Sequence, residues 1–281
     1  MKWFWLIMLS PAIGAGIVAA VTYLLAWFVF PAGGSRGPHD TPARQILGNI
    51  LVLLGEWLAA SWVAYTMVFR WKDGPSLPRP RGSETPLIVL PGFMENPATL
   101  ALLRRRLERA LGVPVTVLKP PPYHLDIAVQ ARMIADNIRD ILDETGAEKV
   151  NLLGHSLGGL QARFIAERTE LGDRIGKVIT VATPHMGSAL ASLLPMQSMR
   201  QMRRGSLFLE ELNRDGPSRK GQLYGICSTH DNLVLPWNCS LSPHGDNFIL
   251  RFQGHTTLLF SRQLVEIVSN ILEEGRKPPH A

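Results

Sequence analysis

A serine lies between two glycines in the segment Gly154-His155-Ser156-Leu157-Gly158. The mainly apolar run at 150–153 predicts a buried strand before it, and residues 160–168 are compatible with a helix after it. A tight turn between a strand and a helix raises the serine hydroxyl clear of the sheet, and glycines are needed there because a Cβ would clash. The first N–H groups of the helix favour negative charge at the turn. The pattern therefore predicts that Ser156 is a nucleophile.

A nucleophilic serine needs a general base, which is most often a histidine. His255 lies between a strand predicted at 248–252 and a helix predicted to start near Leu258. The loop after the last strand is where we expect the base when the serine comes first in the chain. His185 directly follows a strand and His280 lies in a basic, proline-rich tail, so both are placed less well. His255 is therefore the predicted base.

The base in turn needs an acidic residue that orients its ring and stabilises its charged form. Asp231 follows the strand predicted at 223–227, in the chain order serine, acid, histidine. Asp215 lies among polar residues before that strand, and Asp246 precedes the final strand. We therefore predict that Asp231 is the orienting acid.

Strands and helices alternate around these residues. We expect strands at 87–90, 115–118, 149–153 and 177–182, and helices at 97–111, 127–145 and after Ser156. Such alternation requires a mostly parallel sheet with helices on both faces, because crossover helices join parallel strands. The length of 281 residues suits one such domain plus an additional segment.

The alternation breaks between residues 186 and 221. This insert is rich in leucine and methionine, and flexible methionine-rich surfaces suit adaptable apolar binding. We expect a lid or the wall of an acyl-chain pocket, with the candidates Met186, Leu190, Leu194, Met199 and Phe208. A plain helical cap that only packs on the core is the alternative.

Further motifs accompany the serine turn along the chain. They are Leu90-Pro91-Gly92-Phe93, Ala182-Thr183-Pro184-His185-Met186-Gly187-Ser188, Ser228-Thr229-His230-Asp231-Asn232-Leu233-Val234-Leu235-Pro236 and Gly254-His255-Thr256-Thr257-Leu258-Leu259. In this order, over about residues 85–273, the chain resembles the bacterial α/β-hydrolase lipases. The resemblance implies the α/β-hydrolase fold with Ser156, Asp231 and His255 as the catalytic residues. It also implies an oxyanion hole made by the backbone N–H groups of Phe93 and Leu157.

Two positions depart from this resemblance. The family usually has a histidine before the Gly-Phe of the oxyanion loop, where this chain has Pro91. Because backbone N–H groups hold the oxyanion, we expect the hole to be kept. Some calcium-binding relatives have an aspartate two residues after the catalytic histidine, where this chain has Thr257. We therefore expect neither a metal site nor a cofactor.

Two apolar segments precede the hydrolase region. Residues 4–30 carry no charge, and residues 46–69 are interrupted by Asn49 and Glu56. A bilayer-spanning helix needs about 20 residues, whereas the apolar core of a signal peptide has about 7–15. We expect a transmembrane hairpin, in which Asn49 and Glu56 share a face that packs on the first helix or on a second copy of the chain. The alternative is that residues 46–69 lie partly buried against the hydrolase domain.

The predicted organisation has four parts. A membrane anchor covers residues 1–71, with helices at about 4–30 and 46–69, and a proline-rich linker covers 72–85. The α/β-hydrolase domain covers 86–275, with its insert at about 186–221, and a tail covers 276–281. The net charge of +6 comes from scattered and juxtamembrane residues, so it does not indicate nucleic-acid binding.

Basic residues beside the helices predict the sidedness of the anchor. The loop between the helices has Arg36 and Arg44, while Lys2, Arg70, Lys72, Arg79 and Arg81 lie outside the hairpin. By the positive-inside rule, both termini and the hydrolase domain lie on the cytoplasmic side of a bacterial inner membrane. Cys227 and Cys239 flank Asp231 closely enough to form a disulfide, which would suit the periplasm. Buried free cysteines are common, however, so the cytoplasmic side is preferred.

The expected function is that of a membrane-anchored serine hydrolase that cleaves carboxyl esters of lipids through an acyl-enzyme. A thioesterase or an acyltransferase is an alternative, because the acyl group can pass to acceptors other than water. A catalytically silent, membrane-tethered interaction module is the alternative from another class. The presence of Ser156, Asp231 and His255 argues against it, since a scaffold needs none of the three.

The topology can be tested with reporters fused after Ala281. Green fluorescent protein should fluoresce there and alkaline phosphatase should stay inactive, because the basic flanks hold the C-terminus in the cytoplasm. A cysteine introduced at Ser35 should react with an impermeant maleimide added outside the inner membrane. Active phosphatase at the C-terminus would instead move the hydrolase domain to the periplasm.

Overall fold

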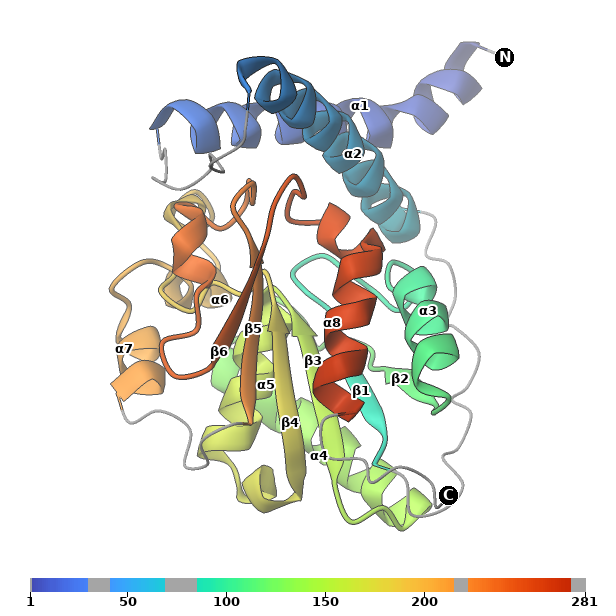
Figure 1. Cartoon of the computed structure of the whole chain (residues 1–281), viewed down its shortest axis with the longest axis vertical. Coiled ribbons are helices and arrows are strands. Elements are labelled where there is room, and N and C mark those ends of the chain that lie inside the picture. Colours follow the sequence, from blue (N-terminus) through green and yellow to red (C-terminus); the bar gives the residue numbers. More distant parts are fainter. Residues whose placement is uncertain (1, 30–40, 69–84, 215–221, 274–281) are drawn as a thin grey trace.

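The computed structural model describes residues 2–29, 41–68, 85–214 and 222–273 (Figure 1). Its centre is a six-stranded sheet with the strand order β2-β1-β3-β4-β5-β6, in which each neighbouring pair is parallel. The strands are β1 (Leu87–Leu90), β2 (Val115–Val117), β3 (Val150–His155), β4 (Ile175–Val181), β5 (Leu223–Ser228) and β6 (Asp246–Leu250). The prediction of a parallel α/β sheet is thereby confirmed.

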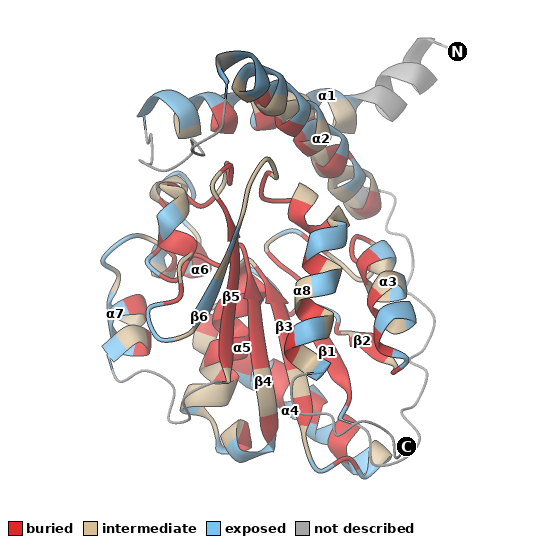
Figure 2. Cartoon of the chain, viewed as in Figure 1, coloured by how far each residue is buried: buried red, intermediate tan, exposed pale blue. Residues whose placement is uncertain are grey.

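Helices cover both faces of this sheet. On one face lie α3 (Ala101–Leu111) and α8 (Arg262–Glu273), and on the other lie α4 (Ile127–Thr145) and α5 (Leu157–Arg168). Each face has its own apolar core, and β1, β3, β4 and β5 between them are mostly buried, whereas β6 at the edge of the sheet is largely exposed (Figure 2). Burial on both faces explains why β1 is a continuous apolar run rather than an alternating one.

Local sequence fixes the limits of several elements. Helix α4 begins and ends where predicted, because Asp126 accepts the N–H of Ala128 at its start and Gly146 adopts a left-handed conformation at its end. Helix α3 starts four residues later than predicted, because the Asn96 side chain holds the preceding residues in a turn. Strand β6 covers Asp246–Leu250 rather than 248–252, since Phe252 has a φ of 57° that ends the extended backbone.

A helical hairpin lies across the end of the sheet where the strands terminate (Figure 1). It consists of α1 (Lys2–Leu24), a π-helical turn (Leu25–Val29) and α2 (Pro42–Val68). A Cβ on Gly16 would lie 2.8 Å from the indole nitrogen of Trp57, whose N–H donates to the carbonyl of Ala12 at 2.8 Å. The small residues of α1 therefore let α2 approach closely. By length and composition, both helices are candidates to cross a membrane.

One face of α2 packs on the hydrolase domain. Asn49 and Glu56 on this face are buried, and Gly48 lies directly against the ring of Phe252. The expectation that this polar face packs on the first helix or on a second copy is therefore wrong for Glu56, which contacts the hydrolase domain. The outward surface of the hairpin is exposed, as Figure 2 shows. Its exposed apolar residues include Ile17, Val21, Ile46, Leu47, Leu51 and Leu58.

The insert after β4 forms short helices beside the end of the sheet. They are a 3₁₀-helix (Ala189–Ser192), α6 (Gln197–Gln201) and α7 (Leu207–Arg214). Further 3₁₀-helices are found at Glu170–Arg174, Trp237–Ser240 and Thr257–Phe260. Of the predicted parts, the end of the insert at 215–221, most of the linker and the tail lie outside the described residues.

Candidate active site

Ser156 occupies the turn between β3 and α5. Its φ of 52° is a left-handed value that a residue with a side chain rarely adopts, and its N–H donates to the carbonyl of Val181 at 2.8 Å. A Cβ on Gly154 would lie 2.3 Å from the carbonyl oxygen of Gly158, and one on Gly158 would lie 2.3 Å from that of Leu90. The strained turn therefore needs both glycines.

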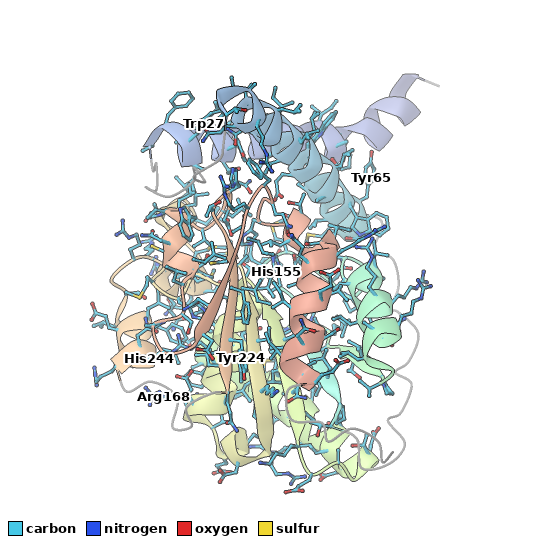
Figure 3. The ribbon with its side chains drawn as sticks, in the orientation of Figure 1. Trp27, Tyr65, His155, Arg168, Tyr224 and His244 are labelled. Carbon is cyan, nitrogen blue, oxygen red and sulfur yellow. The ribbon has the colours of Figure 1, made fainter. Side chains whose placement is uncertain are left out.

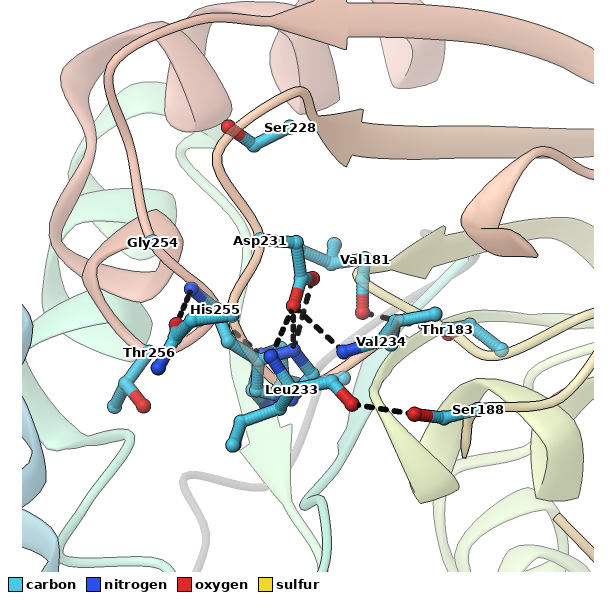
Figure 4. Close-up of polar contacts among 12 residues, drawn as sticks. Val181, Thr183, Ser188, Ser228, Asp231, Leu233, Val234, Gly254, His255 and Thr256 are labelled. Atoms are coloured by element: carbon cyan, nitrogen blue, oxygen red, sulfur yellow. Dashed lines mark hydrogen bonds and ion pairs between the residues drawn. The ribbon is translucent and has the colours of Figure 1, made fainter. Parts of the chain in front are cut away.

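Asp231 and His255 are in direct contact, although 24 residues separate them (Figure 4). Nδ1 of His255 lies 2.9 Å and 3.1 Å from the two carboxylate oxygens of Asp231. The Oδ1 atom also accepts the N–H groups of Leu233 and Val234, each at 2.8 Å. These donors hold the buried carboxylate in place. Asp246, in contrast, is exposed at the opposite end of β6.

The surroundings of His255 favour its charged form. Burial by itself lowers the pKa of this histidine, but the adjacent Asp231 carboxylate outweighs that effect, and Glu56 and Glu95 contribute in the same direction. The pKa of His255 therefore lies above its ordinary value. A base in this setting can hold a proton that it takes from a neighbouring hydroxyl.

His155 connects the serine turn to the loop of His255. Figure 3 labels it between the sheet and the hairpin. Its ring centroid lies 4.8 Å from that of His255, and its Nε2 lies 3.2 Å from the His255 carbonyl oxygen, to which it donates. Because His155 directly precedes Ser156, this contact brings the serine turn and the histidine loop together.

Glu95 is a buried carboxylate that the sequence analysis did not select. Its Oε1 lies 2.9 Å from Nδ1 of His155, and its Oε2 accepts the N–H of Gly92 at 2.6 Å. Burial raises the pKa of Glu95, but the charge of His155 and the Gly92 N–H outweigh it, so the pKa is lowered. Glu95 therefore fixes the loop that carries Phe93.

Phe93 and Leu157 follow two neighbouring strand ends. Leu90 of β1 pairs with Gly154 of β3, so the backbone of Phe93 and the first residue of α5, Leu157, belong to the same edge of the sheet. The Phe93 ring packs edge-on against Tyr123, with centroids 4.9 Å apart. This placement is compatible with the predicted oxyanion hole.

The insert residues fall into two groups. Met199 is buried in a small apolar cluster with Leu157 and Leu160, and Phe208 packs against this cluster. Met186 and Leu194 are exposed and Leu190 is half-buried. The first group forms the contact between insert and domain, as in the cap alternative, whereas only the second group offers apolar surface for a substrate.

His185 has a structural place beneath the insert. Arg163, fully buried on α5, donates to Nδ1 of His185 at 3.1 Å and to Oδ1 of Asn213 at 2.8 Å. Nε2 of His185 lies 3.0 Å from the hydroxyl of Thr180. Burial, together with the Arg163 charge, lowers the pKa of His185 well below its usual value, so this histidine is neutral. It anchors α7 rather than joining Ser156.

Cys227 and Cys239 are both free and buried. Burial, with a smaller contribution from the charge of Asp231, raises the pKa of the Cys227 thiol to about 12. Both residues are therefore packing residues beside the Asp231 loop, and no disulfide joins them.

Comparison with known proteins identifies the family. A profile described as the alpha/beta hydrolase fold matches residues 87–253, more than half of the chain, so the protein belongs to this family. Over 57 residues the chain is 42% identical to triacylglycerol lipases of Pseudarthrobacter phenanthrenivorans and Burkholderia plantarii. That stretch covers 20% of this chain but only 17% and 15% of the two lipases.

Solved structures support the same fold. The mature form of Bacillus licheniformis lipase BlEst2 matches with a TM-score of 0.57 and 17% identity, covering 71% of this chain and 96% of that one. Aspergillus fumigatus lipase B matches with a TM-score of 0.61 and 17% identity, covering 71% of this chain and 55% of that one. The hairpin and the linker, residues 1–85, precede the part that the family profile matches.

Weak signals could have pointed to the residues that the sequence analysis missed. Glu95 comes two residues after Phe93, and His155 comes directly before Ser156, so both were close to predicted strand ends. Asn232 follows Asp231, and its Oδ1 accepts the His255 N–H at 3.2 Å. Polar residues directly beside a predicted catalytic residue are candidates for holding it in place.

The packing of the serine turn can be tested with Gly158→Ala. The new Cβ would press on the carbonyls of Leu90 and Pro91, which are backbone and cannot swing away, so the hydrolase domain should lose about 1–3 kcal/mol of unfolding free energy or fail to fold. Urea unfolding in detergent measures this. Gly14→Ala is the control, because nothing lies within 4 Å of its Cβ. Equal stability of Gly158→Ala and wild type would contradict the described turn.

Proposed function

We propose that this protein is a membrane-attached serine hydrolase that cleaves carboxyl esters of lipids. The observation that carries the proposal is the buried pairing of Asp231 with His255 beside the strained Ser156 turn. A buried carboxylate that is hydrogen-bonded to a histidine orients it as the general base for a serine nucleophile. The chain order serine, acid, histidine is the order found in α/β-hydrolases.

The mechanism follows from the positions of the protons. Nδ1 of His255 donates to Asp231, which leaves Nε2 as the ring nitrogen with a lone pair. Nε2 takes the Ser156 proton as the hydroxyl attacks the ester carbonyl, and Asp231 stabilises the imidazolium that results. His255 then gives the proton to the leaving alcohol, and water clears the acyl-enzyme in a second, equivalent step.

The negative charge on the carbonyl oxygen needs donors in place before the reaction. The N–H groups of Phe93 and Leu157 supply them in the proposed mechanism, and each such donor is worth about 10²–10³ in rate. The hydrogen bond from the Gly92 N–H to the Glu95 carboxylate holds the loop that carries Phe93, so the Phe93 N–H does not have to reorganise during the reaction.

The substrate class rests on the hairpin and on the relatives. The exposed apolar surface of the hairpin suits attachment to a bilayer, and the basic flanks favour the cytoplasmic side of a bacterial inner membrane. Two relatives are named triacylglycerol lipases, which favours esters with fatty acyl chains. A thioesterase or acyltransferase would use the same residues, and the acceptor of the acyl group distinguishes them.

Hydrolysis of p-nitrophenyl esters by the purified full-length protein in detergent tests the proposal. Wild type should release p-nitrophenol, and Ser156→Ala should abolish turnover while the thermal unfolding temperature stays unchanged, because only the hydroxyl is removed. A series of acyl lengths then measures the chain preference. Turnover by Ser156→Ala close to that of wild type would refute the assignment of the nucleophile.

The orienting acid gives a second test, through pH. Hydrolysis needs neutral His255, whose pKa is raised by Asp231, so activity should fall as pH drops through a value above 6.5. Asp231→Asn should lower kcat by up to about 10⁴ and move this acid limb to lower pH, because the charge is lost. Asp246→Asn, at an exposed site, should change neither. The opposite pattern would make Asp246 the acid.

A further inference from the structure

Glu56 places a carboxylate from the hairpin directly on the loop of the proposed base. Its side chain is 1% exposed. Its Oε1 accepts the N–H of Thr256 at 2.8 Å, and its Oε2 accepts the N–H of Thr257 at 3.0 Å. These are the two residues that follow His255. Each carboxylate oxygen of Glu56 thus accepts one of these two adjacent backbone N–H groups.

The loop is shaped to receive this carboxylate. A Cβ on Gly254 would lie 2.4 Å from Oε2 of Glu56, so a side chain at this position would displace the carboxylate. The Gly254 N–H donates to the hydroxyl of Thr257 at 2.6 Å. That hydroxyl donates in turn to the Gly254 carbonyl at 3.2 Å, so Thr257 and Gly254 hold the turn that carries both donors to Glu56.

The backbone of His255 itself is held from two other directions. Its N–H donates to Oδ1 of Asn232, and its carbonyl accepts from Nε2 of His155. Asn232 in turn donates through Nδ2 to the hydroxyl of Thr22 on α1, at 2.8 Å. Both helices of the hairpin are therefore hydrogen-bonded to residues that fix His255.

Four charged or titratable groups surround the His255 ring, each from a different element. Asp231 follows β5, Glu95 follows β1, His155 ends β3, and Glu56 comes from α2. Asp231 makes the direct hydrogen bonds. Glu56 and Glu95 add further negative charge, and negative charge favours the imidazolium that forms when His255 takes a proton.

From this geometry, and resting on the hydrolysis proposed above, we infer that Glu56 is a positioning residue. It acts through the His255 loop, so the hairpin is a structural part of the active site as well as an anchor. Burial of a carboxylate is costly unless it is hydrogen-bonded, and the two backbone donors explain why Glu56 is tolerated in an apolar helix at this position.

Kinetics of Glu56→Gln test the inference. This variant keeps the size of the side chain but removes its charge and turns one acceptor into a donor that faces a backbone N–H. We expect kcat for p-nitrophenyl butyrate to fall about 10- to 100-fold with little change in KM, and the acid limb of the pH profile to move to lower pH. Glu56→Asp keeps the charge, so it should recover part of kcat and the wild-type acid limb.

Trp57→Phe is the matched control. Trp57 is the neighbouring residue of α2, is 40% exposed and donates to Ala12 within the hairpin rather than to the hydrolase domain. It should keep the wild-type kcat and pH profile. A folded Glu56→Gln protein with wild-type kcat and acid limb would overturn the inference.

Amide hydrogen exchange tests the contact between Glu56 and the loop of His255 without a measurement of activity. In wild type, the amides of Thr256 and Thr257 should exchange slowly, and Glu56→Gln should accelerate both while the amides of β3 stay protected. Fast exchange of these two amides in wild type would overturn the inference, even where a variant fails to fold. Absence of ester hydrolysis by wild type would instead refute the proposed function and leave this measurement valid.

Discussion

The site depends on holding His255 in register with Ser156, although the two come from distant strands. Ser156 follows β3 and His255 lies in the loop after β6, the edge strand, with β4 and β5 between them. Pairing within the sheet fixes the positions of the strand ends, but it does not fix the loop that follows β6. Contacts from three directions do so: Asp231 on the ring, His155 and Asn232 on the backbone, and Glu56 on the two residues that follow.

Three buried carboxylates surround this loop, and each is compensated by backbone N–H groups. Asp231 has the donors of Leu233 and Val234, Glu95 has that of Gly92, and Glu56 has those of Thr256 and Thr257. Charge-assisted bonds of this kind offset the cost of burying a carboxylate and leave it able to stabilise a neighbouring imidazolium. The hairpin thereby has two chemically different surfaces. Its outer surface exposes apolar side chains, and its inner surface supplies the Glu56 carboxylate to the loop of the proposed base.

The fold and the contact between Asp231 and His255 could be predicted from local patterns. Apolar runs mark β1 and β3, Asp126 and Gly146 mark the ends of α4, and the glycines around Ser156 mark a turn that backbone sterics restrict. The roles of Glu56 and Glu95 could not be predicted in this way, because Thr256 lies 200 residues from Glu56 and His155 lies 60 residues from Glu95. A carboxylate in an apolar helix shows only that a partner exists. Which surface supplies that partner depends on how the hairpin packs, and the choice between the first helix, a second copy and the hydrolase domain needed the structure.

In the proposed mechanism one serine, at the turn after β3, is activated by the histidine held in this way. Fluorophosphonate probes react with activated serines, so labelling of the full-length protein followed by peptide mass spectrometry measures this activation. We expect a single adduct on the peptide that contains Ser156, and its loss in His255→Ala and in denatured protein. An adduct on a different serine, or equal labelling of Ser156 in wild type and His255→Ala, would rule out activation of Ser156 by His255.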